Sequence, residues 1–200
     1  MKRIITVILS LAASLVVMAQ VRITTPETEL IIKADKGADL QILYFGARLS
    51  DADAANIEAA GVPGHSAYRA YGLWCASEAS LGVTHADGNL STSLKVESVM
   101  QSDVIDNSIV TKVVMKDAVY PFYVTVCYRA YQDVDMIETW TEIANLGKKP
   151  VTLTRFDSGY LPVRVGDVWL SHLHGTWAAE GLLVQEPLQR GMKVIKNKDG

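Results

Sequence analysis

Two histidines stand two residues apart in the segment Ser171–Trp177, which reads SHLHGTW. Polar and apolar residues alternate here, so an extended chain would place His172 and His174 on the same face of one strand. Such a pair can contribute to a metal site, but zinc requires at least a third protein ligand. The other histidines, His65 and His85, are distant in the sequence, and no Cys, Asp or Glu falls at ligand spacing. The sequence therefore predicts a surface or edge pair of imidazoles, with no metal and no cofactor.

Acidic residues are the second group that could do chemistry, because sugar-cleaving enzymes place two carboxyl groups on either side of one bond. Asp87, Asp133 and Asp135 lie in turns, where an Asp side chain usually accepts hydrogen bonds from its own backbone. Asp157 and Glu180 lie outside such turns, yet no spacing links them. There is also no Gly-x-Ser-x-Gly motif and no phosphate-binding glycine pattern. We therefore predict that this segment holds no catalytic residue.

An aromatic-rich stretch, Tyr68–Trp74, follows a long run of small residues. Aromatic faces can stack on the apolar faces of sugar rings, so Trp74 is a candidate for a sugar contact. The competing interpretation is that Trp74 closes one end of the fold, and the residues alone leave both open.

Charge and cysteine content narrow the classes of function. A net charge of -3 and scattered basic residues provide no basic face, so we expect no nucleic-acid partner. Two cysteines are too few for a disulfide framework. Cys127 falls in a strand-like run that would bury it as a thiol, so a bridge between Cys75 and Cys127 is the less favoured alternative.

The first residues have the order of a secretory signal peptide. Met1–Arg3 is basic, Ile4–Val17 is apolar, and small residues precede Gln20. We predict a signal peptide over 1–19 and a mature chain that is periplasmic or secreted, with no membrane span after cleavage. An uncleaved anchor is the alternative.

From Glu29 onward, short runs rich in Val, Ile, Thr and aromatics alternate with turn residues, which predicts an all-β fold. In the run that begins at Leu40, Ile42 and Tyr44 should share a face with Leu40. Phe45 should lie on the other face, and both faces should be covered.

Three further runs, 93–100, 108–116 and 122–131, should pair as adjacent antiparallel strands. The connecting turns are Asp106–Asn107 and Asp117–Pro121. So many antiparallel strands without a repeat predict a large β-sandwich.

Three local predictions complete the organisation. The runs 136–144 and 151–156 should form a hairpin around the turn Asn145–Pro150. The segment 50–70 should be a long loop in which 57–60 forms at most one helical turn. Beyond these, the last residues begin a strand and a turn, so we expect the sequence to continue.

An ordered set of short motifs resembles the N-terminal domain of glycoside hydrolase family 36 α-galactosidases, from about Asp39 to Gly200. No single motif is specific, but their order is. The motifs are, in chain order, Tyr44–Leu49 (YFGARL), Tyr71–Gly72, His85–Asn89 (HADGN), Asn145–Gly147, Pro150–Leu153, Leu173–Glu180 (LHGTWAAE), Pro187–Leu188 and Arg190–Gly191.

The resemblance implies a galactose-mutarotase-like β-supersandwich over 20–200, truncated before a (β/α)8 catalytic barrel. It implies that both catalytic aspartates lie in that barrel. The reaction would be the retaining hydrolysis of terminal α-galactosides, in which one carboxylate attacks the anomeric carbon and the other protonates the leaving oxygen. The implied partners are α-galactoside oligosaccharides and the chain's own barrel, and a homo-oligomer is compatible with the family.

The resemblance also singles out the residues after the Tyr-Gly pair, which approach the galactose site in the family. Many members have Gly-Asp-Phe-Arg-Glu-Pro there, whereas this chain has Trp74–Ala79, WCASEA. Cys75 and Ser77 replace the Asp and Arg, which indicates a changed substrate preference. Trp74 is then the candidate for stacking on sugar and Glu78 for a hydrogen bond to it.

The leading hypothesis is that the chain is the non-catalytic N-terminal domain of an exported α-galactosidase and forms part of the active-site rim. Two alternatives remain at this stage. One is a free-standing carbohydrate-binding β-sandwich, and the other is the N-terminal domain of another exported glycosidase.

Overall fold

The computed structural model describes residues 20–61, 63–72, 78–163, 166–189 and 191–196. The predicted signal peptide, Trp74 and Cys75 lie outside these residues. The chain divides into two compact units, Met1–Pro162 and Val163–Gly200. None of the described helices has the length and apolar character that a membrane span requires.

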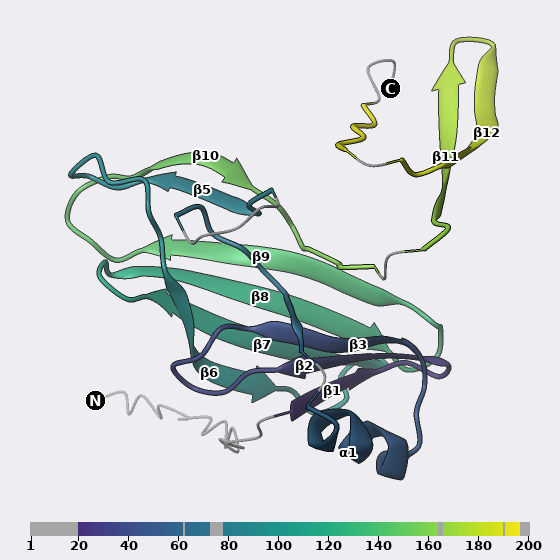
Figure 1. Ribbon diagram of the computed structural model, residues 1–200, viewed down its shortest axis with the longest axis horizontal. Coiled ribbons are helices and arrows are strands. Elements are labelled where there is room, and N and C mark those ends of the chain that lie inside the picture. The colour runs from purple at the N-terminus through teal and green to yellow at the C-terminus, as the bar shows by residue number, and fades with distance from the viewer. Residues whose placement is uncertain (1–19, 62, 73–77, 164–165, 190, 197–200) are drawn as a thin grey trace, which may run out of the picture. The chain divides into compact units, whose positions relative to one another are not determined.

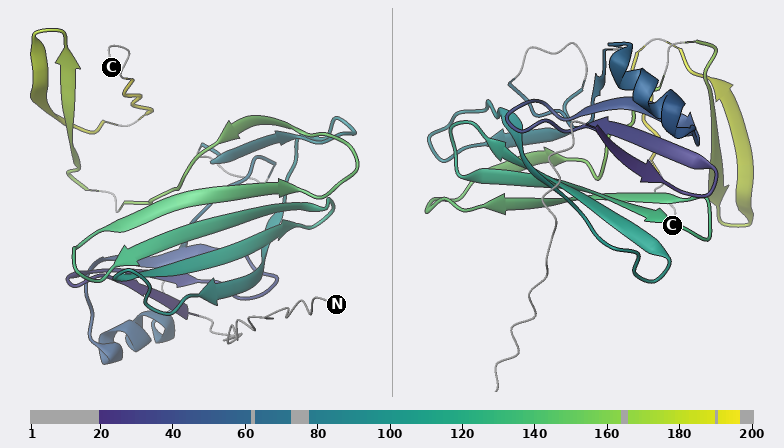
Figure 2. Two further views of the ribbon diagram at one scale, coloured as in Figure 1. Left: turned by 180° about the vertical axis from the view of Figure 1, so that it is seen from behind. Right: turned by 90° about the horizontal axis from the view of Figure 1, so that it is seen from below.

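The first unit contains two four-stranded antiparallel sheets and one two-stranded sheet (Figures 1 and 2). The first sheet has the order β1 (Gln20–Thr24), β2 (Thr28–Lys33), β3 (Gln41–Ala47) and β4 (His65–Ser66). The second has the order β6 (Leu94–Gln101), β7 (Ser108–Asp117), β8 (Phe122–Tyr131) and β9 (Ile137–Asn145). The small sheet pairs β5 (Leu81–Thr84) with β10 (Thr152–Phe156). The all-β antiparallel sandwich is therefore confirmed.

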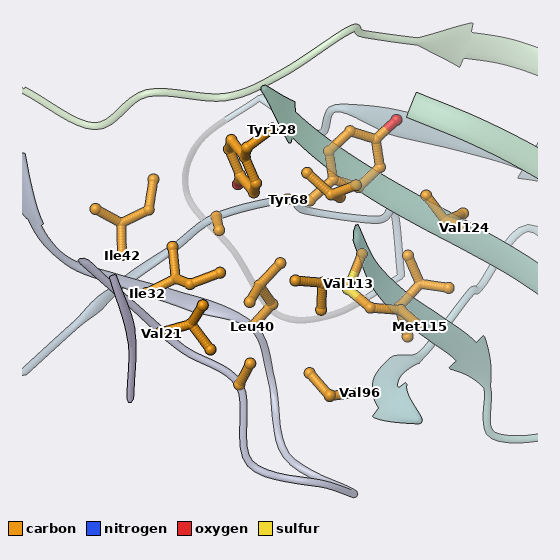
Figure 3. Packing of buried hydrophobic residues seen from close by; sticks show 14 of the residues in the cluster. Val21, Ile32, Leu40, Ile42, Tyr68, Val96, Val113, Met115, Val124 and Tyr128 are labelled. Carbon is orange, nitrogen blue, oxygen red and sulfur yellow. The ribbon is translucent and has the colours of Figure 1, made fainter. Parts of the chain in front are cut away.

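The core lies between the two large sheets, because alternate residues of each strand point inward. On β8, Val124, Val126 and Tyr128 are buried against residues of β1 and β2 such as Val21 and Ile32 (Figure 3). Burial of such side chains contributes about 1.5–3 kcal/mol each. This contact between the sheets is what fixes them face to face.

The predicted antiparallel set 93–131 is confirmed as β6, β7 and β8. Asp106 and Asn107 both have positive φ angles, 49° and 54°, as a two-residue type I′ hairpin turn requires. At the other turn, the Asp117 carboxylate is buried and accepts backbone N–H bonds from Ser93, Val119 and Tyr120. The turn residues therefore determined both hairpins.

The predicted alternation along β3 is wrong beyond Ile42, because a bulge interrupts the pairing. Ile32 pairs with Ile42, but Ile31 pairs with Tyr44, so one extra residue lies between the two pairs. A bulge of one residue reverses the faces that follow it. Phe45 consequently faces the core side together with Ile42, and Tyr44 faces the opposite side.

The expectation of a loop over 50–70 is also wrong, because Asp51–Ala59 forms the helix α1. The Ser50 hydroxyl accepts the backbone N–H of Asp53 at 3.1 Å and donates to the Asp53 carboxylate at 2.7 Å. Ser50 is therefore the N-cap residue of the helix. Gly61, with a φ of +61°, follows the helix in the left-handed conformation that favours glycine.

The predicted hairpin between 136–144 and 151–156 is wrong. β9 pairs with β8, whereas β10 crosses over and pairs with β5 in a different sheet. The turn itself is present, since the Asn145 side chain binds the backbone N–H of Gly147 and the carbonyl of Lys149. Pro150 has no N–H with which to continue a ladder on β9, and the chain leaves the sheet there.

Buried charge is paired on the outer side of the first sheet, beside α1. The Glu29 carboxylate is fully buried and forms an ion pair with Arg22, which also contacts Asp51 of the helix at 2.5 Å. Glu29 additionally accepts the backbone N–H of Leu49 at 3.0 Å. Burial alone would raise the pKa of Glu29, but these bonds outweigh it and leave the pKa below its ordinary value.

The second unit is a hairpin of β11 (Trp169–Thr176) and β12 (Ala179–Pro187). The predicted strand at SHLHGTW is confirmed as β11. His172 is half-buried and lies 3.6 Å from the Glu186 carboxylate, while His174 is exposed. Among the described residues, no three His, Cys, Asp or Glu side chains are grouped closely enough to hold a metal ion.

Candidate functional site

The candidate site is the stem of the segment that carries Trp74 and Glu78. On its N-terminal side, the backbone N–H of Tyr71 bonds to the carbonyl of Leu81 at 2.8 Å. The carbonyl of Tyr71 accepts the N–H of Thr92 at 2.9 Å. Gly72 has a φ of +108°, and a Cβ there would lie 2.5 Å from the Cα of Ser91. Glycine at the Tyr-Gly motif is thus required by both backbone angle and close approach.

On the C-terminal side of the stem, Glu78 belongs to a small ion-pair cluster on the surface. Nη1 of Arg155 donates to Oε2 of Glu78 at 2.5 Å. The same guanidinium uses Nε and Nη2 to bind the Asp157 carboxylate, at 3.2 and 3.1 Å. Arg155 therefore joins two carboxylates that are distant in the sequence, which a planar fork of donors favours. We call Glu78, Arg155 and Asp157 the Glu78 cluster.

The backbone beneath the Glu78 cluster is held from both sides. The Asp157 N–H bonds to the carbonyl of Ser80 at 2.9 Å. The Asp157 carbonyl accepts the Tyr68 hydroxyl and the Thr141 hydroxyl, each at 3.1 Å. Since Tyr68 is buried in the core, these bonds attach the cluster to the rigid interior.

A bulge and a glycine set the position of Arg155. The register of β10 on β5 shifts between Leu153 and Arg155, which brings Arg155 opposite Gly82. A Cβ on Gly82 would lie 2.5 Å from the Thr154 hydroxyl, so a larger residue would displace the bulge. The local sequence thus aims the guanidinium toward Glu78.

The electrostatics of the Glu78 cluster leave one excess negative charge. Hydrogen bonding to Asp157 and the nearby charges of Asp157 and Glu78 raise the pKa of Arg155, against the effect of burial. The Glu78 side chain is 59% exposed, and its Oε1 accepts no hydrogen bond from the described residues. The cluster can therefore offer a free carboxylate oxygen to the hydroxyl of a neutral ligand.

Two of the other acidic candidates, Asp87 and Asp135, have structural partners. Asp87 accepts the backbone N–H of Asn89, as expected of a turn aspartate, and also the Tyr120 hydroxyl at 2.7 Å. Asp135 departs from this expectation, because its carboxylate receives the hydroxyls of Thr25 and Thr28 on the facing sheet. Hydrogen bonding from those two hydroxyls lowers the pKa of Asp135.

Arg155 is the member of the candidate site that sequence reasoning missed. Its position in a short strand carries no motif, and its partner Glu78 is distant in the sequence. The only available signal was the charge pattern Arg155–Asp157, in which two opposite charges lie on the same side of a strand. Glu78 is in the cluster, whereas Trp74 lies outside the described residues.

The fold defines an antiparallel β-sandwich domain with a small accessory sheet. The family model of the glycosyl hydrolase family 36 N-terminal domain matches residues 38–200, and the chain belongs to this family. This match confirms the resemblance carried by the ordered motifs. No curated protein sequence matches the chain.

Solved α-galactosidases share the fold. The enzyme from Lactobacillus brevis has a TM-score of 0.75 at 19% identity and covers 87% of this chain. AgaA from Geobacillus stearothermophilus, in complex with raffinose, has a TM-score of 0.75 at 19% identity and covers 86%. AgaB from the same organism has a TM-score of 0.73 at 20% identity and covers 86%. The chain spans 28% of the length of each of these enzymes.

Proposed function

We propose that the chain is the N-terminal, non-catalytic domain of an exported, retaining α-galactosidase that hydrolyses terminal α-galactosides. The observation that carries this proposal is the family match over 38–200. The similar α-galactosidases extend well beyond the matched region, which supports a separate catalytic barrel as this domain's partner. The basic and apolar order of residues 1–19 supports export to the periplasm or beyond.

Within that enzyme, the Glu78 cluster forms part of the active-site rim. Its guanidinium holds Glu78 at the end of the Tyr71–Glu78 segment, and its backbone is attached to the core through Tyr68 and Thr141. A carboxylate oxygen that is not bound by any described residue can accept a sugar hydroxyl, and the excess negative charge does not repel a neutral oligosaccharide. Trp74, on the same segment, provides the aromatic face on which a sugar ring stacks.

The test compares two arginine variants of the full-length protein with raffinose as substrate. Arg155→Met releases Glu78, and we expect kcat/KM to fall about tenfold, which corresponds to about 1.4 kcal/mol of transition-state stabilisation. Arg129→Met is the matched control, because Arg129 forms a similar exposed ion pair with Glu138 at 2.9 Å on another face. Its kcat/KM should stay within twofold of the parent.

Three results would contradict parts of the proposal. If both variants hydrolyse raffinose like the parent, the rim role of the Glu78 cluster is wrong. If the full-length protein cleaves no α-galactoside, the assigned activity is wrong. If residues 20–200 alone show robust turnover, the non-catalytic assignment is wrong. Export is checked separately by N-terminal sequencing of the protein from the producing cell, which should begin at Gln20.

A further inference from the structure

A cavity of about 440 Å³ lies between the two large sheets of the first unit, beside strands β3 and β9. The first sheet and the second sheet each form one wall, and the segment after β10 forms the third. The volume is within the range of pockets that bind small ligands. The lining residues are Thr28, Leu30, Ile42, Phe45, Tyr128, Asp135, Ile137, Thr139, Gly159, Tyr160 and Leu161.

The strand register explains why these side chains meet. Leu30 lies on the inner face and pairs with Phe45. The bulge in β3 brings Phe45 to that same face. On the facing sheet, Tyr128 pairs with Thr139, so these two also share the inner face. The inward side chains of the two sheets therefore leave an open space between them at this point.

Tyr128 is the most deeply buried of the polar residues that line the cavity. The residue is 5% exposed, and its hydroxyl is not one of the buried side-chain atoms that lack a partner, which among the described residues are Oγ of Ser80 and Nδ1 of His172. Its strand lies inside the sheet between β7 and β9, so only its side chain can reach the cavity. Tyr68, which is 4% exposed, has its hydroxyl bound to the Asp157 carbonyl. A tyrosine side chain that lines a cavity can offer its hydroxyl to a ligand or water there.

The polar groups around the cavity have fixed and complementary roles. Burial raises the pKa of Tyr128, so its hydroxyl stays protonated and can donate. Hydrogen bonds from Thr25 and Thr28 lower the pKa of Asp135, so its carboxylate stays ionised and can only accept. Thr139 donates its hydroxyl to the Ser158 carbonyl at 3.3 Å, which leaves its lone pairs available as acceptors.

The rest of the wall is apolar and partly aromatic. Leu30, Ile42 and Ile137 provide aliphatic surface, and Tyr160 adds a second ring beside the cavity. At the mouth, Phe45 is 48% exposed, so its ring face is accessible from solvent. A ring face beside a few convergent donors and acceptors suits a ligand with one apolar face and a hydroxylated edge.

We propose that this cavity between the sheets binds a hexopyranose unit, with the ring against Phe45 and its hydroxyls bound to Tyr128 and Asp135. None of its lining residues belongs to the Glu78 cluster, so the proposal does not depend on the rim role. It gives the domain a saccharide-binding site of its own. The domain would then hold carbohydrate as well as support catalysis.

Isothermal titration calorimetry of the full-length protein with D-glucose and D-galactose tests this proposal. Tyr128→Phe removes one hydroxyl without changing the shape of the ring, and we expect hexose binding to weaken about fivefold to tenfold. Tyr120→Phe is the control, because it removes a hydroxyl that already has a protein partner, the Asp87 carboxylate, near the other end of β8. Its hexose affinity should equal that of the parent.

A second variant guards against loss of folding. Phe45→Ala changes a side chain at the cavity mouth that is half exposed, and it should weaken hexose binding at least as much as Tyr128→Phe. The proposal is overturned if the parent binds neither hexose at this site, as when another part of the protein fills the cavity. It is also overturned if Tyr128→Phe and Phe45→Ala bind both hexoses as tightly as the parent. Unchanged kcat and KM in Tyr128→Phe would separate this site from the site of hydrolysis.

Discussion

The two ends of strand β8 differ in how their inward side chains are enclosed. At its N-terminal end, Phe122 is 1% exposed and meets the His85 ring edge to face, with 5.8 Å between centroids. His85 in turn stacks on Tyr120 at 3.7 Å and contacts the Thr92 hydroxyl at 3.0 Å. At the C-terminal end, Tyr128 borders the cavity between the sheets and its hydroxyl has no partner among the described residues.

The difference shows that one strand can serve two purposes. The HADGN turn closes the Phe122 end, because the Asp87 and Asn89 side chains both bind the Tyr120 hydroxyl while the rings of His85 and Tyr120 stack. At the Tyr128 end, the turn after β8 is also bound to the facing sheet, through Asp135 and Gln132, but a cavity remains beside Tyr128. A closely packed and hydrogen-bonded end has a structural role, whereas a cavity lined by polar side chains is a place where a ligand can bind.

The largest effect should come from removing the packed ring. Phe122→Ala should lower the free energy of unfolding by about 3–5 kcal/mol, because it leaves a cavity in a closed part of the core. Phe45→Ala, at the open end, should cost less than about 1.5 kcal/mol, since its ring is already half exposed. Urea unfolding followed by far-ultraviolet circular dichroism measures both. Equal losses would mean that the two ends do not differ in packing.

The next effect concerns the two buried tyrosines. Tyr68→Phe should cost about 1 kcal/mol, because it removes a hydrogen bond to the Asp157 carbonyl. Tyr128→Phe should cost less than Tyr68→Phe, since Tyr128 lines the cavity and no described residue forms a hydrogen bond with its hydroxyl. Thermal unfolding of the full-length variants without added sugar gives the comparison. A clear destabilisation by Tyr128→Phe would show that its hydroxyl already has a partner in the intact protein.

Acid should lower the stability of the folded protein through Asp135, which lines the cavity. Hydrogen bonds from Thr25 and Thr28 hold the pKa of Asp135 below its ordinary value of 3.8. A carboxylate with a lowered folded-state pKa stabilises the protein above its unfolded-state pKa, and this contribution is lost as pH falls below about 4. The unfolding midpoint of Asp135→Asn should therefore fall less than that of the parent as the pH is lowered below about 4.

The control for that measurement is Asp133→Asn, which changes an exposed carboxylate in the same turn. Its unfolding midpoint should follow the parent's dependence on pH. If the two variants behave alike, the hydroxyls of Thr25 and Thr28 do not stabilise the charged form of Asp135.

Local signals in the sequence predicted the parts of the fold that depend on neighbouring residues. Asp106–Asn107 is a turn pair whose backbone preference fixes the β6–β7 hairpin. The helix α1 was equally local, and the N-cap residue Ser50, followed by Asp51, Asp53 and an Ala-rich run, could have revealed it. It was overlooked because the same small residues are common in loops.

Long-range contacts explain what the sequence could not predict. The pairing of β10 with β5 depends on Gly82 accommodating a bulge between Leu153 and Arg155, which is distant along the chain. The position of Arg155 beside Glu78 follows only from that pairing. The cavity depends on the bulge in β3, which reverses Phe45 after a run whose alternation appeared regular.

The last effect concerns the reactivity of the Cys127 thiol on the outer face of β8, one residue from Tyr128. Burial raises the pKa of the Cys127 thiol from 9.0 to about 11, which lowers its thiolate fraction near pH 8 about 100-fold. In a Cys75→Ser background, Cys127 should react with a thiol-specific disulfide reagent at least 100-fold more slowly than glutathione. Denaturant should restore the ordinary rate.

The labelling rate is then measured in the folded protein with and without hexose. If it stays slow in both cases, the opening at Tyr128 is confined to one side of the sheet. Rapid native labelling would show instead that this end of β8 is open on both faces.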